Sequence, residues 1–277
     1  MSRVVVVGGG VIGCAVAERL SLEKHQVTLL ERDQLACRAS GAAAGELSPS
    51  SLASDSESLA MFPELVARIE KDSAMNVEFR VQQGLKPAFT SDEARTLNRE
   101  GGRWLDAAEC RKAEPAISTD VLGAVLLEHA HLMPPQFVRA LARAAAARRA
   151  EICEGTPATG FDITRDEIHG VRTPAGNLAA DWAVIAGGTE EDSGFDDRPT
   201  VAGIATLLEL ARKLVPGLAA ASLQRVWAGL RPVTADGKPI VAVTGPRNLI
   251  VATGHHRKGI LLAPLAAMQV ADLITMA

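Results

Sequence analysis

The sequence predicts an α/β protein in which a larger domain with a parallel β-sheet is interrupted by a smaller, inserted α+β domain. Three observations lead to this fold class. A strand, a helix and a second strand follow one another within the first 31 residues, which is the pattern of a β-α-β unit. Short strand-like runs then alternate with short polar helices. The last part of the chain returns to a strand and a long apolar helix.

The N-terminal elements have the clearest patterns. Arg3–Val7 is a run of mostly β-branched residues, typical of a strand buried on both faces of a parallel sheet. A glycine-rich turn separates it from a helix expected over Val11–Leu22, and Gln26–Glu31 is expected to be the second parallel strand. We interpret the serine-rich segment Ser48–Ser58 as a loop before a helix over Leu59–Lys71.

The remaining elements are shorter and are separated by glycine, proline and polar residues. Strands are expected at Val77–Val81, Leu85–Thr90, Leu122–His129, Ala150–Cys153, Ala158–Ile163, Glu167–Thr173, Leu178–Ala186, Ser222–Leu230 and Leu249–Thr253. Helices are expected at Ser91–Arg99, Asp106–Glu114, Gln136–Arg149, Thr200–Leu214 and Gly259–Met276.

The composition argues against several classes of protein. The net charge is −4 and the charges are interspersed, so we expect neither a nucleic-acid partner nor an anionic membrane surface. The four cysteines lack metal-ligand spacing, which predicts mostly buried, reduced thiols in a cytoplasmic protein. No run approaches the roughly 20 apolar residues of a membrane span. The basic residues of one helix are interpreted as its solvated face: Arg139, Arg143, Arg148 and Arg149.

The first strand is followed by a glycine fingerprint. Residues 8–13 read G-x-G-x-x-G between a strand and a helix, the context that indicates a Rossmann-like dinucleotide-binding domain. Gly8 permits the tight turn, Gly10 lets the backbone approach a pyrophosphate, and Gly13 lets the helix pack closely. Glu31, at the end of the second strand, is placed to accept hydrogen bonds from an adenosine ribose. A glycine turn without a ligand is the weaker alternative.

Further segments distinguish FAD from NAD. Residues without bulk at 40–45 let the backbone pass close to a large flat ligand. Here the chain resembles the glycine oxidase and D-amino-acid oxidase family of flavoenzymes, on its thiamine-biosynthesis branch. The segments that carry the resemblance are Arg38–Gly45, Glu128–Gln136, Glu154–Ala158, Trp227–Pro239 and Ala252–Pro264. The alternative interpretation, an NAD-dependent dehydrogenase, is supported by the glycine fingerprint alone.

The resemblance implies FAD as the cofactor and assigns residues to it. Arg231 would pair with the substrate carboxylate, because a planar guanidinium matches a carboxylate in two parallel hydrogen bonds, and Arg257 would face the substrate as well as FAD. The fingerprint and the resemblance together assign to FAD the residues Gly8, Gly10, Val11, Ile12, Gly13, Glu31, Arg32, Ala39, Ser40, Ala44, Gly45, Glu46, Ala158, His255, His256, Arg257, Lys258, Gly259, Ile260 and Leu261. No metal is expected, since His129 and His131 lack a third ligand.

Two positions depart from the family. Glu46 stands where the family commonly has methionine; its charge would repel a substrate carboxylate unless the side chain turns to solvent, and the sequence leaves both open. After Trp182–Gly187 the family continues through a block of antiparallel strands that contains a substrate-site tyrosine. Here Gly188–Asp196 follows directly, and the chain has no tyrosine. We therefore expect an FAD-binding domain at 1–83, 133–187 and 228–277, and a truncated substrate domain at 84–132 and 188–227.

The leading hypothesis is an oxidase that deaminates glycine or another small amino acid or amine. Hydride would pass from the substrate Cα to flavin N5, and oxygen would reoxidise the flavin to give peroxide. No side chain is assigned as an acid or base. The alternative is a flavin-binding remnant with an incomplete substrate site. Because the missing strands should leave apolar surface uncovered, we expect poor solubility or a partner, which a second copy of the chain would satisfy.

Overall fold

The computed structural model describes residues 1–50, 52–100, 102–187 and 198–277. The predicted segment Gly188–Asp196 lies outside the described residues. The chain divides into two compact units. Unit 1 holds Met1–Arg80, His131–Asp196 and Gly229–Ala277, and unit 2 holds Val81–Ala130 and Asp197–Ala228.

Unit 1 is built on a six-stranded sheet with the order β12-β13-β11-β1-β2-β7. Its strands are β1 (Arg3–Val7), β2 (Gln26–Leu30), β7 (Glu151–Cys153), β11 (Trp182–Ala186), β12 (Ile240–Val243) and β13 (Leu249–Thr253). Every neighbouring pair is parallel except β12 with β13. The central strand β1 is buried at Val4, Val5 and Val6, because both faces of the sheet are covered.

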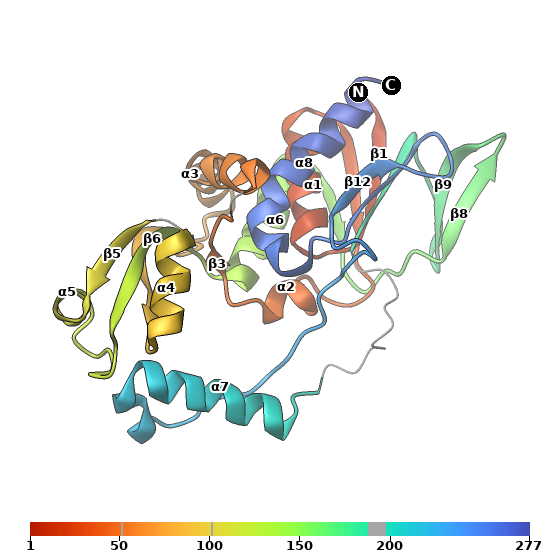
Figure 1. The fold of residues 1–277 in the computed structure, drawn as a ribbon. Coiled ribbons are helices and arrows are strands. Elements are labelled where there is room, and N and C mark those ends of the chain that lie inside the picture. Colours follow the sequence, from red (N-terminus) through yellow and green to blue (C-terminus); the bar gives the residue numbers. More distant parts are fainter. Residues whose placement is uncertain (51, 101, 188–197) are drawn as a thin grey trace. The chain divides into compact units, whose positions relative to one another are not determined.

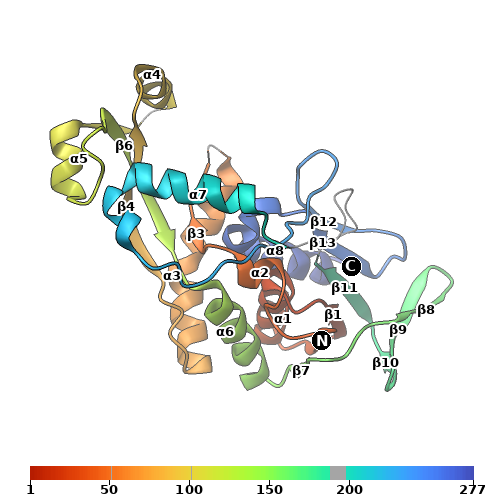
Figure 2. The same cartoon turned by 90° about the horizontal axis from the view of Figure 1, so that it is seen from below.

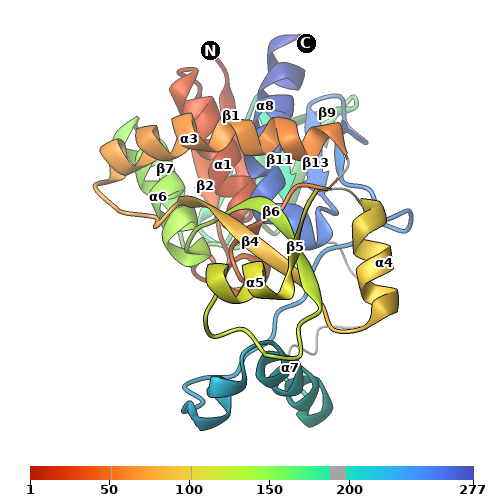
Figure 3. The same cartoon turned by 60° about the vertical axis from the view of Figure 1, so that its left-hand side comes forward.

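One face of the sheet is covered by helices (Figure 1). They are α1 (Val11–Leu22), α6 (Pro134–Ala147) and α8 (Gly259–Thr275), and α3 (Ala53–Ser73) runs across their outer side (Figure 3). The segment His256–Thr275 is long and apolar enough to cross a membrane, contrary to the sequence expectation, but 61% of the apolar window is buried. The apolar side chains of this helix therefore form part of the protein core, where α8 packs against α1 and α3.

The other face of the sheet carries a three-stranded antiparallel sheet (Figure 2). It consists of β8 (Gly160–Thr164), β9 (Glu167–Thr173) and β10 (Gly176–Ala179). Ile168 and Val171 pack there against Val5 of the main sheet. Asn248 joins the layers, since its side chain accepts a hydrogen bond from Ile168 N at 2.8 Å and donates to Asp181 O at 2.8 Å.

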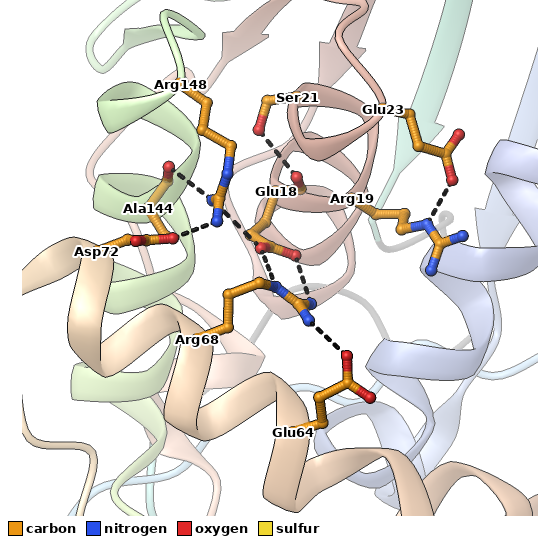
Figure 4. A network of polar contacts seen from close by, with 9 residues as sticks. All are labelled: Glu18, Arg19, Ser21, Glu23, Glu64, Arg68, Asp72, Ala144 and Arg148. Carbon is orange, nitrogen blue, oxygen red and sulfur yellow. Dashed lines mark hydrogen bonds and ion pairs between the residues drawn. The ribbon is translucent and has the colours of Figure 1, made fainter.

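A buried ionic network joins three helices (Figure 4). Glu18 of α1 is 1% exposed and pairs with Arg68 Nε of α3 at 2.9 Å and with Arg148 Nη1 at 3.4 Å. Arg148, which follows α6, also pairs with Asp72. The expectation of a fully solvated basic face is therefore wrong at Arg148, although Arg139, Arg143 and Arg149 are exposed. Burial of Glu18 requires these partners, because an unpaired buried carboxylate is costly.

Unit 2 contains β4 (Arg80–Ala88), α4 (Ser91–Glu100), β5 (Arg103–Asp106), α5 (Ala107–Ala113), β6 (Gly123–His131) and α7 (Val201–Leu214). Strand β6 pairs with both β4 and β5. Asp106 and Glu109 form a reciprocal capping box at the start of α5. In contrast, α7 has no buried residue; Val201 is 88% exposed and Leu207 is 64% exposed.

The structure confirms most predicted elements and corrects several. Strands β1, β9 and β13 and helix α1 have the predicted bounds. The strands predicted at 77–81 and 85–90 are one strand, β4, because Gly84 lies under the His129 ring instead of breaking the strand. The strand predicted at 178–186 is two, since the chain crosses between the two sheets of unit 1 at Ala180–Asp181. Strands β5 and β12 were not expected.

Two further corrections concern loops. The serine-rich loop predicted at Ser48–Ser58 ends early, because α3 already begins at Ala53. No strand forms over Ser222–Leu230. Its apolar residues Leu223 and Trp227 are 60% and 55% exposed, and no described strand pairs with the segment.

Candidate cofactor and substrate site

The glycine loop between β1 and α1 has little room for side chains. Gly8 has φ +115°, and a Cβ there would lie 1.9 Å from Ala186 O. A Cβ on Gly13 would lie 1.9 Å from Gly8 O. Gly10 differs, since its nearest neighbour would be Ser40 Oγ at 3.3 Å. Packing within the protein therefore requires glycine at positions 8 and 13. At Gly10 the protein leaves more space, which would let a ligand phosphate approach the backbone.

The start of α1 offers hydrogen-bond donors. Among the described residues, the N–H groups of Gly10, Ile12 and Gly13 have no partner, whereas Val11 N donates to Ser40 Oγ at 2.9 Å. Free N–H groups and the helix dipole together favour an anion at this end of a helix. The loop therefore fits the pyrophosphate of a dinucleotide.

Glu31 lies directly after β2, beside the glycine loop. Its two carboxylate oxygens accept hydrogen bonds from Gly9 N at 2.6 Å and from Asp33 N at 2.8 Å. A carboxylate oxygen can accept a second hydrogen bond, so a ribose contact is compatible with this position. Glu31, Asp33 and Cys37 form the one described cluster with metal-ligand spacing, but Asp33 pairs with Arg38 at 2.8 Å and we assign no metal to it.

The small-residue segment contains α2 (Ala39–Ala42) and leads to β3 (Glu46–Leu47). A Cβ on Gly45, which has φ +85°, would lie 2.0 Å from Leu132 O. A Cβ on Gly229 would lie 2.5 Å from Ala42 Cβ. Small residues are therefore needed where backbones pass closely. Glu46 is exposed and accepts a hydrogen bond from Ser48 Oγ, which agrees with the orientation towards solvent.

A turn connects β13 to α8 and closes the site; it contains the short helix η2 (His256–Lys258). Gly254 has φ +75°, and a Cβ there would lie 2.4 Å from Thr234 Cγ2. Gly259, at the start of α8, faces the start of α1, since its Cβ would lie 4.0 Å from Val11 Cγ1. The closing turn and the glycine loop are thus neighbours, although more than 240 residues separate them in the sequence.

The two predicted substrate arginines lie on adjoining segments. His256 N donates to Pro232 O at 2.8 Å, so the residue after Arg231 is bonded to the residue before Arg257. Both arginines are exposed, and neither has a partner among the residues that the structure describes. Guanidinium groups that have no partner among the described residues are chemically suited to receive a carboxylate.

His255 is 4% exposed at the start of the closing turn. Its Nδ1 has no partner among the described residues, and burial lowers the pKa of the ring to about 4. A cavity of about 420 Å³ borders it, lined mostly by α8. The imidazole is therefore neutral at pH 7.

Two residues that were not predicted, Ser50 and Asp55, contact the closing turn. Lys258 Nζ bonds to Asp55 Oδ2 at 2.5 Å and to Ser50 Oγ at 2.8 Å. Ser50 and Asp55 lie in the segment interpreted as a loop; an acidic residue in the first turn of a helix is the signal that marks Asp55. The predicted adenine neighbour Ala158 packs on the core beneath β8–β10.

The fold and the glycine loop define an α/β protein of the dinucleotide-binding class. The particular family follows from comparison with known proteins. The model of the FAD dependent oxidoreductase family (DAO) matches residues 3–190 and 180–273, and the chain belongs to this family. FAD is accordingly its cofactor, and the cradle described above fits it.

Similar proteins include glycine oxidases. The glycine oxidase of Geobacillus kaustophilus is 30% identical, with 98% of this chain and 92% of that protein aligned. The bifunctional protein ThiO/ThiG of Nostoc sp. is 30% identical over 98% of this chain. The chain spans about half the length, 52%, of that relative. The crystal structure of glycine oxidase from Bacillus cereus superposes with a TM-score of 0.92 at 26% identity, covering 100% of this chain and 98% of that one.

The comparisons also support a missing block. The alignment with the G. kaustophilus enzyme runs over 350 positions, although the chain has 277 residues. The two matches to the family model meet within residues 180–190, next to Gly187, where the sequence departs from the family. The relatives therefore carry a segment here that this chain lacks.

Proposed function

We propose that the chain is an FAD-dependent oxidase of a small amino acid or amine, with glycine as the first candidate substrate. One observation carries the proposal. Arg231 and Arg257 lie without partners among the described residues, on segments joined by the His256–Pro232 hydrogen bond. The second of these segments leads to Gly259, which lies next to Val11 at the start of α1. The names of the glycine oxidase relatives favour the same substrate class.

The residues of the chain supply binding and orientation. Arg231 binds the substrate carboxylate through two parallel hydrogen bonds, and Arg257 adds a second positive charge. Such anchoring turns the substrate Cα–H towards the cofactor, and fixed orientation removes part of the barrier. FAD, when bound, takes up the hydride and passes the electrons to oxygen. Backbone N–H groups at the start of α8 stabilise negative charge that develops there.

The experiment uses the purified protein in its FAD-bound form. Its visible spectrum is recorded before and after anaerobic addition of glycine, sarcosine or D-alanine, and peroxide is measured in air. Bleaching of the flavin bands together with peroxide formation supports the proposal. A yellow protein that none of these amines reduces contradicts it.

A second candidate function is FAD binding without amine oxidation. The missing block and the absence of any buried residue on α7 favour it, because a shortened substrate domain would leave the substrate site incomplete. The same spectra distinguish the two. We place either function on the thiamine-biosynthesis branch of the family, as the sequence motifs indicate.

A further inference from the structure

An ion pair between Lys258, which was predicted to contact FAD, and Asp55, which was not predicted, attaches α3 to the closing turn. Asp55, in the first turn of α3, is fully buried. Its Oδ2 accepts hydrogen bonds from Lys258 Nζ at 2.5 Å, from Ser50 Oγ at 2.6 Å and from Ser50 N at 2.8 Å. Lys258 Nζ also donates to Ser50 Oγ at 2.8 Å. Three segments of unit 1 thus meet at one carboxylate oxygen.

The pair is charged, and each member needs the other. Burial by itself raises the pKa of Asp55, but the hydrogen bonds from Lys258 and Ser50 outweigh it, and the pKa lies below its ordinary value. Asp55 Oδ1 is buried and has no partner among the described residues. Lys258 is therefore the one described cation that compensates Asp55, and removing either member leaves the other charge without its counterpart.

A second contact fixes the same end of α8. Ser58, one turn further along α3, donates to Leu261 O at 2.7 Å and accepts from Leu265 N at 3.4 Å. Helix α3 therefore holds the chain at Lys258 and at Leu261, on the two sides of the start of α8. This is the part of the turn that lies next to the start of α1.

We propose that Asp55 and Ser50 are positioning residues that hold Lys258, and with it the turn 255–258, in the conformation that receives FAD. The ion pair then sets the affinity for the cofactor, and neither Asp55 of α3 nor Ser50 before it is assigned a contact with the substrate. Loss of the pair lets the turn depart from this conformation, and FAD binding must first order it again. The inference rests on the assignment of FAD.

The test is a titration of the apoprotein with FAD, followed by flavin fluorescence. Asp55→Asn and Lys258→Met are each expected to raise the dissociation constant about tenfold or more. Lys258→Arg keeps the charge that pairs with Asp55, so it is expected to raise the dissociation constant less than Lys258→Met does. Ser50→Ala removes hydrogen bonds without leaving a charge unpaired, and we expect a rise of about threefold.

Asp72→Asn is the matched control. Asp72 lies on the same helix and forms an ion pair with Arg148, but it does not contact the closing turn. Its loss is expected to lower the thermal unfolding temperature while FAD affinity stays unchanged.

Equal weakening by Asp72→Asn and Asp55→Asn, or unchanged binding by Asp55→Asn and Lys258→Met, overturns the proposal. Should Asp55→Asn not fold, the Lys258→Met, Lys258→Arg and Ser50→Ala series decides alone. A wild-type chain that binds no FAD overturns both this proposal and the proposed function. A wild-type chain that binds FAD as tightly as its variants overturns only this one.

Discussion

Arg231 carries the substrate prediction at the scale of single residues. Replacing it by methionine is expected to raise KM for glycine about 10- to 100-fold, because charge-assisted hydrogen bonds to the carboxylate are lost. Steady-state peroxide formation measures this change. An amine without a carboxylate, such as ethylamine, should be affected much less. Arg247→Met is the control, since Arg247 is exposed and pairs with Glu167 at 2.6 Å; an equal effect there contradicts the assignment.

His255 predicts how stability depends on pH. Its pKa is lowered in the folded protein to about 4, so the unfolded chain binds a proton first as the pH falls. Above about pH 6.5 the neutral ring contributes fully to the free energy of unfolding. As the pH falls from about 6.5 to about 4, this contribution is lost, and the free energy of unfolding falls by about 3 kcal/mol at most. Urea unfolding across this range measures it.

The matched comparison is His255→Gln with His169→Gln, because His169 is exposed on β9. His255→Gln should remove most of the loss of stability between pH 6.5 and 4, and His169→Gln should not. Asp272 borders the same cavity, so Asp272→Asn shows whether a nearby carboxylate stabilises the protonated ring. An unchanged pH profile in His255→Gln contradicts the prediction.

At the scale of elements, two glycines of the β1–loop–α1 unit are expected to have different effects: Gly13 on the stability of the fold, and Gly10 on FAD binding. Gly13→Ala should destabilise the fold, because the new Cβ would lie 1.9 Å from Gly8 O. Gly10→Ala should fold almost as well as the wild type, since its nearest contact is 3.3 Å from Ser40 Oγ, but it should weaken FAD binding by about tenfold or more by filling the cradle. Thermal unfolding of the apoprotein and FAD titration measure the two effects. The reverse order of effects would refute this division.

Helix α3 illustrates where element prediction fails. The serine-rich run that precedes it is typical of a loop, yet Ser58 is fully buried and Asp55 is 0% exposed. Ser58 Oγ donates to Leu261 O and Asp55 Oδ2 accepts from Lys258 Nζ, and each of these partners lies 203 residues away. A rule based on local composition has no access to such partners, and it therefore assigns polar residues to solvent.

At the scale of the whole molecule, the exposed apolar residues of α7 bear on association. We expect the purified chain to elute above the size of its 29.1 kDa monomer or to be poorly soluble, because contiguous exposed apolar surface promotes association. The double substitution Leu207→Glu with Leu210→Glu, at side chains that are 64% and 49% exposed, should shift elution towards the monomer. Size-exclusion chromatography measures this.

Leu22→Glu serves as the control, because Leu22 is an exposed apolar residue of α1 in unit 1. It should leave the elution volume of the wild type unchanged. A soluble wild-type chain that elutes as a stable monomer would contradict the association through α7.

Local rules were enough for the α/β class, for the bounds of β1, α1, β9 and β13, and for the dinucleotide cradle. In each case the pattern reflects a requirement within a few residues: buried strands need apolar runs, and a strand-to-helix turn beside a phosphate needs glycine. The motifs shared with flavoenzymes added FAD, which the family match bears out. The individual site roles stay predictions.

Tertiary structure alone decided which distant residues meet. It placed Glu18 between Arg68 and Arg148, and Lys258 against Asp55. It also made one strand of the residues on both sides of Gly84, where a neighbouring histidine covers the glycine. These outcomes depend on packing between segments 45 to more than 200 residues apart. Periodicity and composition indicate whether the residues of one segment face the core or the solvent. Which distant segment they pack against is determined only when the whole chain has folded.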